Sequence, residues 1–453
     1  MLTTLLGIAF LLTLVVLSLV GRREQVGQRY LIGDRGVGSF RTATALVAGF
    51  RDGAGLSAWV ALAIGFGLGA MWLWAGLASA LVAVSLIAKA VRRQAASLEA
   101  YSLNSWVRGR IGPVSAIATA GVLSATAFLY TAAQFAVSAK IAASIFGVSG
   151  VVAVGALGVT ICAYIALGGY LSVIRTDVFQ WAVITVICVI VPFNLAGGAP
   201  SFPPVSSAIS VPLDLGVGMF GIAFLVTFSG GDTWQRVMSA ASDQVATSAP
   251  WLAAALYFLI SLGLVVLGIN IAAAFPELLP DQAFVQLFHR LEGGSFVWAA
   301  LGLLVAASAI STVDTQVYVF ATAAASMVRS DVDQARQVAI VRWASVLFTA
   351  ATGLLALTVG NVVEFLFSAV TLVTVLAPAI VYGALVNREG PMRDHLALIS
   401  IMSGTLVYIL LFATGEFQNI LLTTVPSLVA AAVLVAGLGW QVMSRPLSKR
   451  IGE

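Results

Sequence analysis

Charged residues are scarce in this chain: Asp, Glu, Lys and Arg make up only 9% of its 453 residues, against roughly 25% in soluble proteins. Apolar residues reach 60%. This composition excludes an ordinary soluble domain and indicates a protein that crosses a membrane many times. Cysteine is also scarce, and Cys162 and Cys188 lie inside apolar runs without metal-ligand spacing. A structural disulfide and a metal–thiolate site are therefore not expected.

Catalytic patterns are missing as well. The only two histidines, His289 and His395, fall on opposite sides of the predicted membrane, which argues against a shared acid–base site. The loops carry no phosphate-binding loop or ATP-binding module, so any uphill transport must draw on an ion gradient. The net charge of +4 is dispersed through the loops, and nucleic-acid binding is not expected. Enzymatic activity is not expected either.

The apolar runs predict an all-α polytopic membrane protein, because about 20 residues are needed for each crossing. The segment 2–20 lacks a preceding basic residue and a cleavage site, and it is expected to be a retained anchor rather than a removed signal. We predict thirteen transmembrane helices, at 2–20, 42–67, 68–90, 113–146, 150–168, 176–196, 215–240, 250–274, 296–327, 338–359, 363–386, 396–413 and 419–441.

Basic residues lie mostly on one side of this arrangement. With the N-terminus outside, an odd number of spans places the C-terminus in the cytoplasm. Of the 23 Lys and Arg residues, only Arg51, Lys140 and Arg290 then lie away from the cytoplasmic loops and tail. The positive-inside rule requires this asymmetry. The chain is therefore expected to be a multi-pass protein of the cell (inner or plasma) membrane.

The second predicted span is interrupted at its middle by Arg51-Asp52-Gly53-Ala54-Gly55. Arg or Asp at the centre of a membrane helix costs roughly 2.5–3.5 kcal/mol each, and each glycine weakens the helix by about 1 kcal/mol. A break inside a membrane frees peptide groups that protein, water or a ligand must satisfy, so broken spans often line binding sites. An ion pair against a neighbouring helix, with glycines for close packing, is the alternative.

The seventh predicted span is interrupted in the same way, at Ser229-Gly230-Gly231-Asp232. Five helices separate the two breaks, and five helices reverse the direction of crossing. The pattern therefore predicts two inverted five-helix repeats. The expected division is an extra helix and basic loop at 1–41, the repeats at 42–199 and 200–387, and two further helices with a tail at 388–453.

Three motifs resemble those of one known family. Gly168–Gln180 (GGYLSVIRTDVFQ) resembles the signature of the sodium/solute symporter family, in which a Gly-Gly opening precedes Thr-Asp-x-x-Gln. Trp234-Gln235-Arg236 followed by Ala240-Ala241-Ser242 resembles its second signature, and Ser311–Thr315 (STVDT) resembles its Ser-Thr-x-Asp-Ser motif. Smaller likenesses at Arg29–Arg35 and Ala377-Pro378 extend the resemblance over residues 22 to about 386.

The resemblance implies a fold of the leucine-transporter type, with five plus five inverted helices, one helix before them and two after. It also implies that sodium entry drives the uptake of a small solute. In the family, a conserved sodium site joins two carbonyls of the broken helix to a carbonyl and two hydroxyls of the ninth helix. The matching positions here are Gly53, Leu56, Ser308, Ser311 and Thr312.

Structural roles compete with these assignments. The hydroxyls of Ser311 and Thr312 could bond to their own helix, and Asp177 could be a first-turn carboxylate favoured by the helix dipole. In some members of the family, the aspartate that matches Asp177 belongs to a second sodium site or exit path. The matching positions in the ninth helix here are Asp314 and Thr315, and the number of sodium ions stays open.

The solute pocket is expected at mid-membrane between the two broken helices. Some sugar-transporting relatives carry an amide-bearing residue where this chain has Gly55, so an amino acid is slightly favoured. The aromatic candidates could instead pack or lie at the membrane interface. The candidate walls are Asp52, Gly55, Ser57, Trp59, Trp72, Trp74, Tyr130, Gln134, Ser229 and Gly230.

The predicted function is thus secondary active transport, with sodium as coupling ion, a small organic solute as cargo and the lipid bilayer as setting. Two other functions stay open. One is a solute-sensing receptor of the same fold. The other is a proton-coupled or facilitative transporter, motivated by Asp52, Asp177 and Asp314 within or bordering the membrane.

Overall fold

The computed structural model describes residues 2–20, 27–50, 52–195, 211–291, 293, 295–328, 333–360, 362–386, 391–416 and 419–443. Every regular element among them is a helix, and Val37 and Ala240 form an isolated β-bridge. Outside the described residues lie Arg51, the loop at 196–210, and seven basic residues of the predicted cytoplasmic side: Arg22, Arg23, Arg329, Arg388, Arg445, Lys449 and Arg450.

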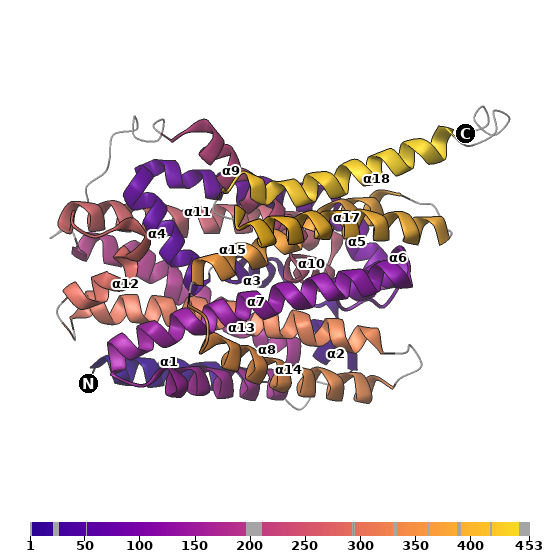
Figure 1. Ribbon diagram of the computed structural model, residues 1–453. Helices are drawn as coiled ribbons and strands as arrows, with labels where there is room; N and C mark the ends of the chain where they lie inside the picture. The colour runs from indigo at the N-terminus through magenta and orange to yellow at the C-terminus, as the bar shows by residue number, and fades with distance from the viewer. Residues whose placement is uncertain are drawn as a thin grey trace.

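Most of the long helices run along one common direction, and the two termini lie at opposite ends of the picture in Figure 1. Helix α13 packs against α7, α8 and α14, while α5 packs against α9 and α11. The α-helices are α1 (Leu2–Leu19), α2 (Gly27–Ile32), α3 (Ser39–Gly49), α4 (Gly53–Phe66), α5 (Met71–Ser97), α6 (Leu103–Arg110), α7 (Pro113–Phe146), α8 (Gly150–Leu195), α9 (Leu213–Ser229), α10 (Gly231–Met238), α11 (Asp243–Ala274), α12 (Pro280–Arg290), α13 (Phe296–Met327), α14 (Gln334–Ala356), α15 (Val362–Val373), α16 (Ala377–Leu385), α17 (Pro391–Thr414) and α18 (Val425–Met443).

The first predicted break is present between α3 and α4. Helix α3 ends at Gly49, and α4 begins at Gly53 after Asp52, whose backbone is extended at φ −98° and ψ 152°. The Asp52 carboxylate accepts a hydrogen bond from the Gly55 N–H and so caps the N-terminus of α4. Asp52 is thus the N-cap residue of α4, and this cap explains why the helix starts directly after it, at Gly53.

The second break lies between α9 and α10, which are bent by 48° at Gly230. The bend frees carbonyls at the end of α9, and side chains from α10 bond to them. Thr233 Oγ1 donates to the Thr227 carbonyl at 2.9 Å, and Trp234 Nε1 donates to the Phe228 carbonyl at 2.6 Å. Both interrupted helices of the predicted fold are therefore present, and side chains of the chain bond to the Gly55 N–H at the first break and to two carbonyls at the second.

Helix α8 holds two predicted spans in one element of 46 residues, interrupted by Gly169 at φ 57° and ψ −152°. At 1.5 Å per residue its length of about 69 Å is twice a bilayer core. By length and hydropathy, nine helices among the described residues can cross a membrane, or ten if the bent α9–α10 pair is one span. This criterion does not confirm the predicted thirteen spans, because it counts some neighbouring spans together, such as the two on either side of Gly169 in α8. The chain is nevertheless a multi-pass membrane protein.

We predict that Gly169→Ala lowers the melting temperature of the purified protein. The backbone conformation of Gly169 is open almost only to glycine, which costs other residues about 1–3 kcal/mol. A Cβ there would also lie 2.5 Å from the Tyr30 ring. The control is Gly155→Ala in the same helix, where a Cβ meets nothing within 4 Å and alanine is the better helix former. If both variants melt alike in a fluorescence scan, the break at Gly169 is not needed.

Candidate functional site

A cavity of about 190 Å³ lies between the two breaks. The first break contributes Asp52 and Gly55 to its wall, and the second contributes Gly230, Gly231 and Asp232. Most of the remaining wall is apolar. Residues from helices far apart in the sequence complete it, among them Leu77, Leu123, Thr126, Tyr130, Val226, Tyr257, Gln316, Val319 and Leu366.

Asp52 is the acidic side chain at the first break, and its side chain is held by neutral donors. Besides the Gly55 N–H, its carboxylate accepts hydrogen bonds from the Tyr130 hydroxyl at 2.8 Å and from Gln134 Nε2 at 2.9 Å. Tyr130 and Gln134 lie one turn apart on α7 and therefore face the same neighbour. The bonds fix the carboxylate at the cavity wall, where 7% of Asp52 is exposed.

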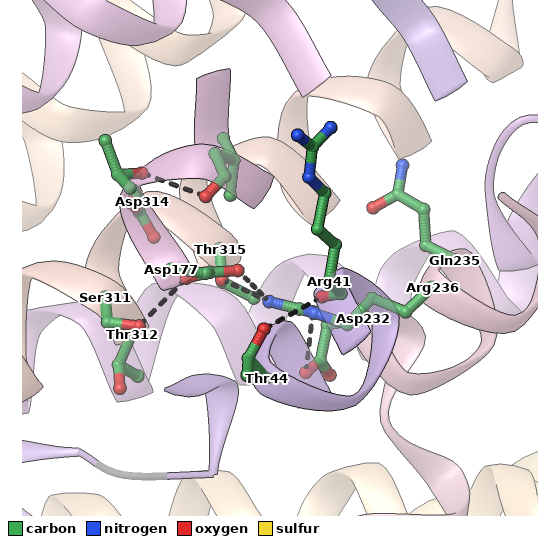
Figure 2. A network of polar contacts seen from close by, with 12 residues as sticks. Arg41, Thr44, Asp177, Asp232, Gln235, Arg236, Ser311, Thr312, Asp314 and Thr315 are labelled. Carbon is green, nitrogen blue, oxygen red and sulfur yellow. Dashed lines mark hydrogen bonds and ion pairs between the residues drawn. The ribbon is translucent and has the colours of Figure 1, made fainter. Parts of the chain in front are cut away.

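Arg236 of α10 is the centre of a second polar network (Figure 2). Its guanidinium pairs with Asp177 at 2.9 Å and with Asp232 at 3.2 Å, and it donates to Thr315 Oγ1 at 2.9 Å. Asp177 comes from α8 and Thr315 from α13, so one side chain ties three helices together. Arg236 and both aspartates are buried. Because an unpaired buried charge is costly, each of these charged side chains needs an oppositely charged partner.

The predicted sodium ligands on α13 lie beside this network. Ser311 donates to Asp177 Oδ1 at 3.0 Å, whereas Thr312 donates to the Ser308 carbonyl of its own helix at 3.1 Å. Ser308 Oγ is buried and has no hydrogen-bond partner in the described part of the chain. Gly53 of α4 approaches the same helix, since a Cβ on it would lie 3.2 Å from the Ala309 methyl. The start of α4 thus lies against α13 at Ala309, next in sequence to Ser308, while Leu56 of α4 is fully buried.

Asp314 lies apart from Arg236. Its Oδ2 accepts a hydrogen bond from the Tyr164 hydroxyl of α8, and its Oδ1 is buried without a partner among the described residues. The three residues predicted for a second cation site thus do not all share one partner. Asp177 and Thr315 both contact Arg236, and Asp314 contacts Tyr164.

Half of the predicted solute-pocket residues line the cavity: Asp52, Gly55, Trp59, Tyr130 and Gly230. Gln134 is buried and donates a hydrogen bond to Asp52. Ser57 Oγ is buried without a partner in the described part of the chain, and Ser229 donates to the Thr374 carbonyl at 3.4 Å.

The two remaining tryptophans contact other helices instead. Trp74 Nε1 donates to the Ala254 carbonyl at 3.2 Å. The Trp72 ring packs against Phe220, and 37% of the residue is exposed.

Two important residues, Arg236 and Tyr257, were not expected at the site. Arg236 is only 3% exposed, although the charge pattern placed it among the cytoplasmic residues. The signal that could have corrected this is Asp232, four residues earlier on the same helix, where an opposite charge forms a helical ion pair. Tyr257 lines the cavity from the middle of α11, and its apolar surroundings in the sequence carry no such signal.

Comparison with known proteins gives relatives at moderate identity. No family model matches the chain. The sodium/proline symporter of Staphylococcus aureus (strain bovine RF122 / ET3-1) is 28% identical over 344 residues, and that of strain JH9 is 27% identical over the same length. Each match covers 68% of this chain and 65% of the relative, so the chain spans less than two thirds of the relatives' length.

Solved structures show the same fold at lower identity. A Na⁺-coupled sialic acid symporter, described as substrate-bound and outward-open, aligns with a TM-score of 0.81 over 97% of both chains at 14% identity. MhsT in complex with L-phenylalanine aligns with a TM-score of 0.54 at 13% identity, over 88% of this chain and 98% of that one. These findings confirm the predicted inverted-repeat fold.

We predict that Arg236→Gln destabilises the protein by about 3–5 kcal/mol, because it leaves Asp177 and Asp232 buried without their cation. Adding Asp177→Asn should recover part of this loss, since one uncompensated carboxylate disappears. The matched control is Arg93→Gln, which breaks the Arg93–Asp243 ion pair, where the Arg93 side chain is 64% exposed. That change should cost less than about 1 kcal/mol. Denaturant unfolding in detergent gives the comparison, and equal losses for both Arg→Gln variants would contradict it.

Proposed function

Because the chain is a homologue of sodium/proline symporters and has the fold of a sodium-coupled symporter, we propose that it couples inward sodium flow to uptake of a small organic solute. The observation that carries this proposal is the cavity between two broken helices, beside buried hydroxyls of α13. Broken membrane helices form the ion and substrate sites of such transporters. The relatives' names are those of transporters, and the function proposed here is transport, not catalysis.

The proposed sodium site uses the carbonyls of Gly53, Leu56 and Ser308 and the hydroxyls of Ser311 and Thr312. Sodium is a hard cation, and oxygen ligands of this kind suit it. The close approach of Gly53 to Ala309 supports the placement, because it brings the start of α4 to the part of α13 that carries these hydroxyls. Asp177 adds a negative charge next to Ser311.

A bound sodium ion would join α4 to α13 and fix the first break in one position. Sodium binding and solute binding would then support each other, as coupled sites do. Inward movement of one charge through 100 mV supplies about 2.3 kcal/mol, which corresponds to roughly fifty-fold accumulation of solute. In the proposed orientation, the chain lies in the cell membrane with its N-terminus outside the cell and its C-terminus in the cytoplasm.

The first candidate class of solute is an amino acid, since the relatives are named sodium/proline symporters and one fold neighbour was solved in complex with L-phenylalanine. The proposed pocket comprises the cavity-lining residues and their neighbours. A second cation site or exit path at Asp177, Asp314 and Thr315 also stays a proposal. A cation there would have to compete with Arg236, which already contacts Asp177 and Thr315.

We predict that Ser311→Ala/Thr312→Ala raises the sodium concentration for half-maximal uptake by roughly tenfold or more, because it removes two of five oxygen ligands. The measurement is solute uptake into proteoliposomes at graded sodium concentrations. The control, Thr322→Ala, removes a buried hydroxyl from the same helix that bonds to its own backbone at Tyr318. Sodium dependence that matches the control variant would argue against this site.

A second prediction concerns the driving ion. Uptake should follow an inward sodium gradient and should not follow an inward proton gradient in potassium buffer. The reverse result would support the proton-coupled transporter motivated by the buried aspartates. Sodium-dependent binding without any flux would support the solute-sensing receptor.

A further inference from the structure

The two half-helices that face the cavity both begin with a carboxylate of the chain itself. Asp52 caps α4, and Asp232 lies in the first turn of α10. Both side chains line the cavity. In membrane transporters, the positive N-terminal ends of half-helices hold the anionic group of a substrate. Here the chain's own carboxylates lie at these two ends, where the carboxylate of a zwitterionic amino acid would otherwise bind.

Gly55 permits this arrangement at the first break. A Cβ on residue 55 would lie 2.4 Å from Asp52 Oδ2 and 2.9 Å from its Cγ, closer than real Cβ atoms approach. A side chain at position 55 would therefore require the Asp52 carboxylate to shift from its present position. The sequence Asp52-x-x-Gly55 therefore allows a carboxylate to form part of the cavity wall.

The negative charge at the cavity is not cancelled by the described residues around it. The donors to Asp52 are neutral, namely the Gly55 N–H, the Tyr130 hydroxyl and the Gln134 amide. Such bonds stabilise a carboxylate without removing its charge. No Lys, Arg or His is among the described residues that line the cavity. At Asp232, the single guanidinium of Arg236 is shared with Asp177.

Aromatic rings form part of the same wall. The ring centroid of Tyr257 is 6.3 Å from that of Phe50 and 6.3 Å from that of Trp59, and all three residues line the cavity. Aromatic faces attract cations within about 6 Å of the ring centre, most strongly where water is excluded. Carboxylates and aromatic rings together are the surroundings in which organic ammonium groups bind.

We infer that the solute is an organic cation, an amine or quaternary ammonium compound without a free carboxylate, whose charged group binds between Asp52 and these aromatic rings. This inference rests on the proposed function, because it takes the cavity as the solute site. It replaces the zwitterionic amino acid, the first candidate class, by a solute with net positive charge.

A matched pair of ligands tests the inference. L-Proline and L-prolinamide share the ring and the ammonium group and differ in that a carboxamide replaces the carboxylate. Titration calorimetry on the purified full chain, in sodium and again in potassium, should show that prolinamide binds roughly tenfold tighter than proline. Choline, as a quaternary ammonium probe, should also bind. Equal or tighter binding of proline overturns the inference, as does the absence of binding by both cations.

Two variants connect the preference to Asp52. Asp52→Asn keeps the size and an acceptor oxygen but removes the charge, and it should abolish the tighter binding of prolinamide. Asp214→Asn, at an exposed position in the first turn of α9, is the control and should leave the preference intact. A preference that survives in Asp52→Asn excludes this carboxylate as its source. If Asp52→Asn does not fold, the wild-type ligand pair still decides the charge preference.

The outcomes for this inference and for the proposed function are separate. Sodium-dependent binding of proline, without a preference for prolinamide, overturns the cationic solute and leaves sodium symport in place. A preference for prolinamide, with a prolinamide affinity that is the same in potassium as in sodium, supports the cationic solute and contradicts sodium coupling.

Discussion

A peptide group that loses its helical partner inside a bilayer must find another one, and this constraint shapes the centre of the molecule. At the second break the carbonyls of Thr227 and Phe228 are freed, and side chains of Thr233 and Trp234 donate to them. At the first break the need is the opposite one. The Gly55 N–H lacks a helical acceptor, and the Asp52 carboxylate supplies it. Side chains of the chain itself thus satisfy these three peptide groups, and residues of both breaks line the cavity between them.

Charge is the second constraint. The site contains Asp52, Asp177, Asp232 and Asp314, but Arg236 is the single cation that ion-pairs with any of them among the described residues. Neutral donors supply the other side-chain hydrogen bonds to Asp52, Asp177 and Asp314. A site with an excess of buried carboxylates attracts cations from water and repels anions. Sodium beside Ser311 and an organic cation beside Asp52 both fit this field, whereas a solute with net negative charge does not.

The sequence was most informative where a rule of membrane insertion was broken. Charges and glycines inside apolar runs predicted both interrupted helices, because such residues have few structural reasons to be there. The number of spans is not confirmed, and α8 holds two of the predicted spans, at 150–168 and 176–196, with its interruption at the single residue Gly169. The role of Arg236 could not be read from charge counting, because burial depends on neighbours from α8 and α13. Tyr257 reaches the cavity only through the packing of α11, which no local pattern encodes.

The geometry also explains how one short segment can serve two ligands. Asp52 holds the first turn of α4 through the Gly55 N–H, and the proposed sodium carbonyl of Gly53 belongs to that same turn. A cationic solute that pairs with Asp52 would offset the negative charge of the carboxylate without breaking this cap, because each carboxylate oxygen can accept more than one hydrogen bond. Removal of the cap would loosen the turn that presents Gly53 to α13. In the proposed mechanism, solute and sodium would therefore be coupled through the position of residues 52–55, and no long-range path would be needed to connect them.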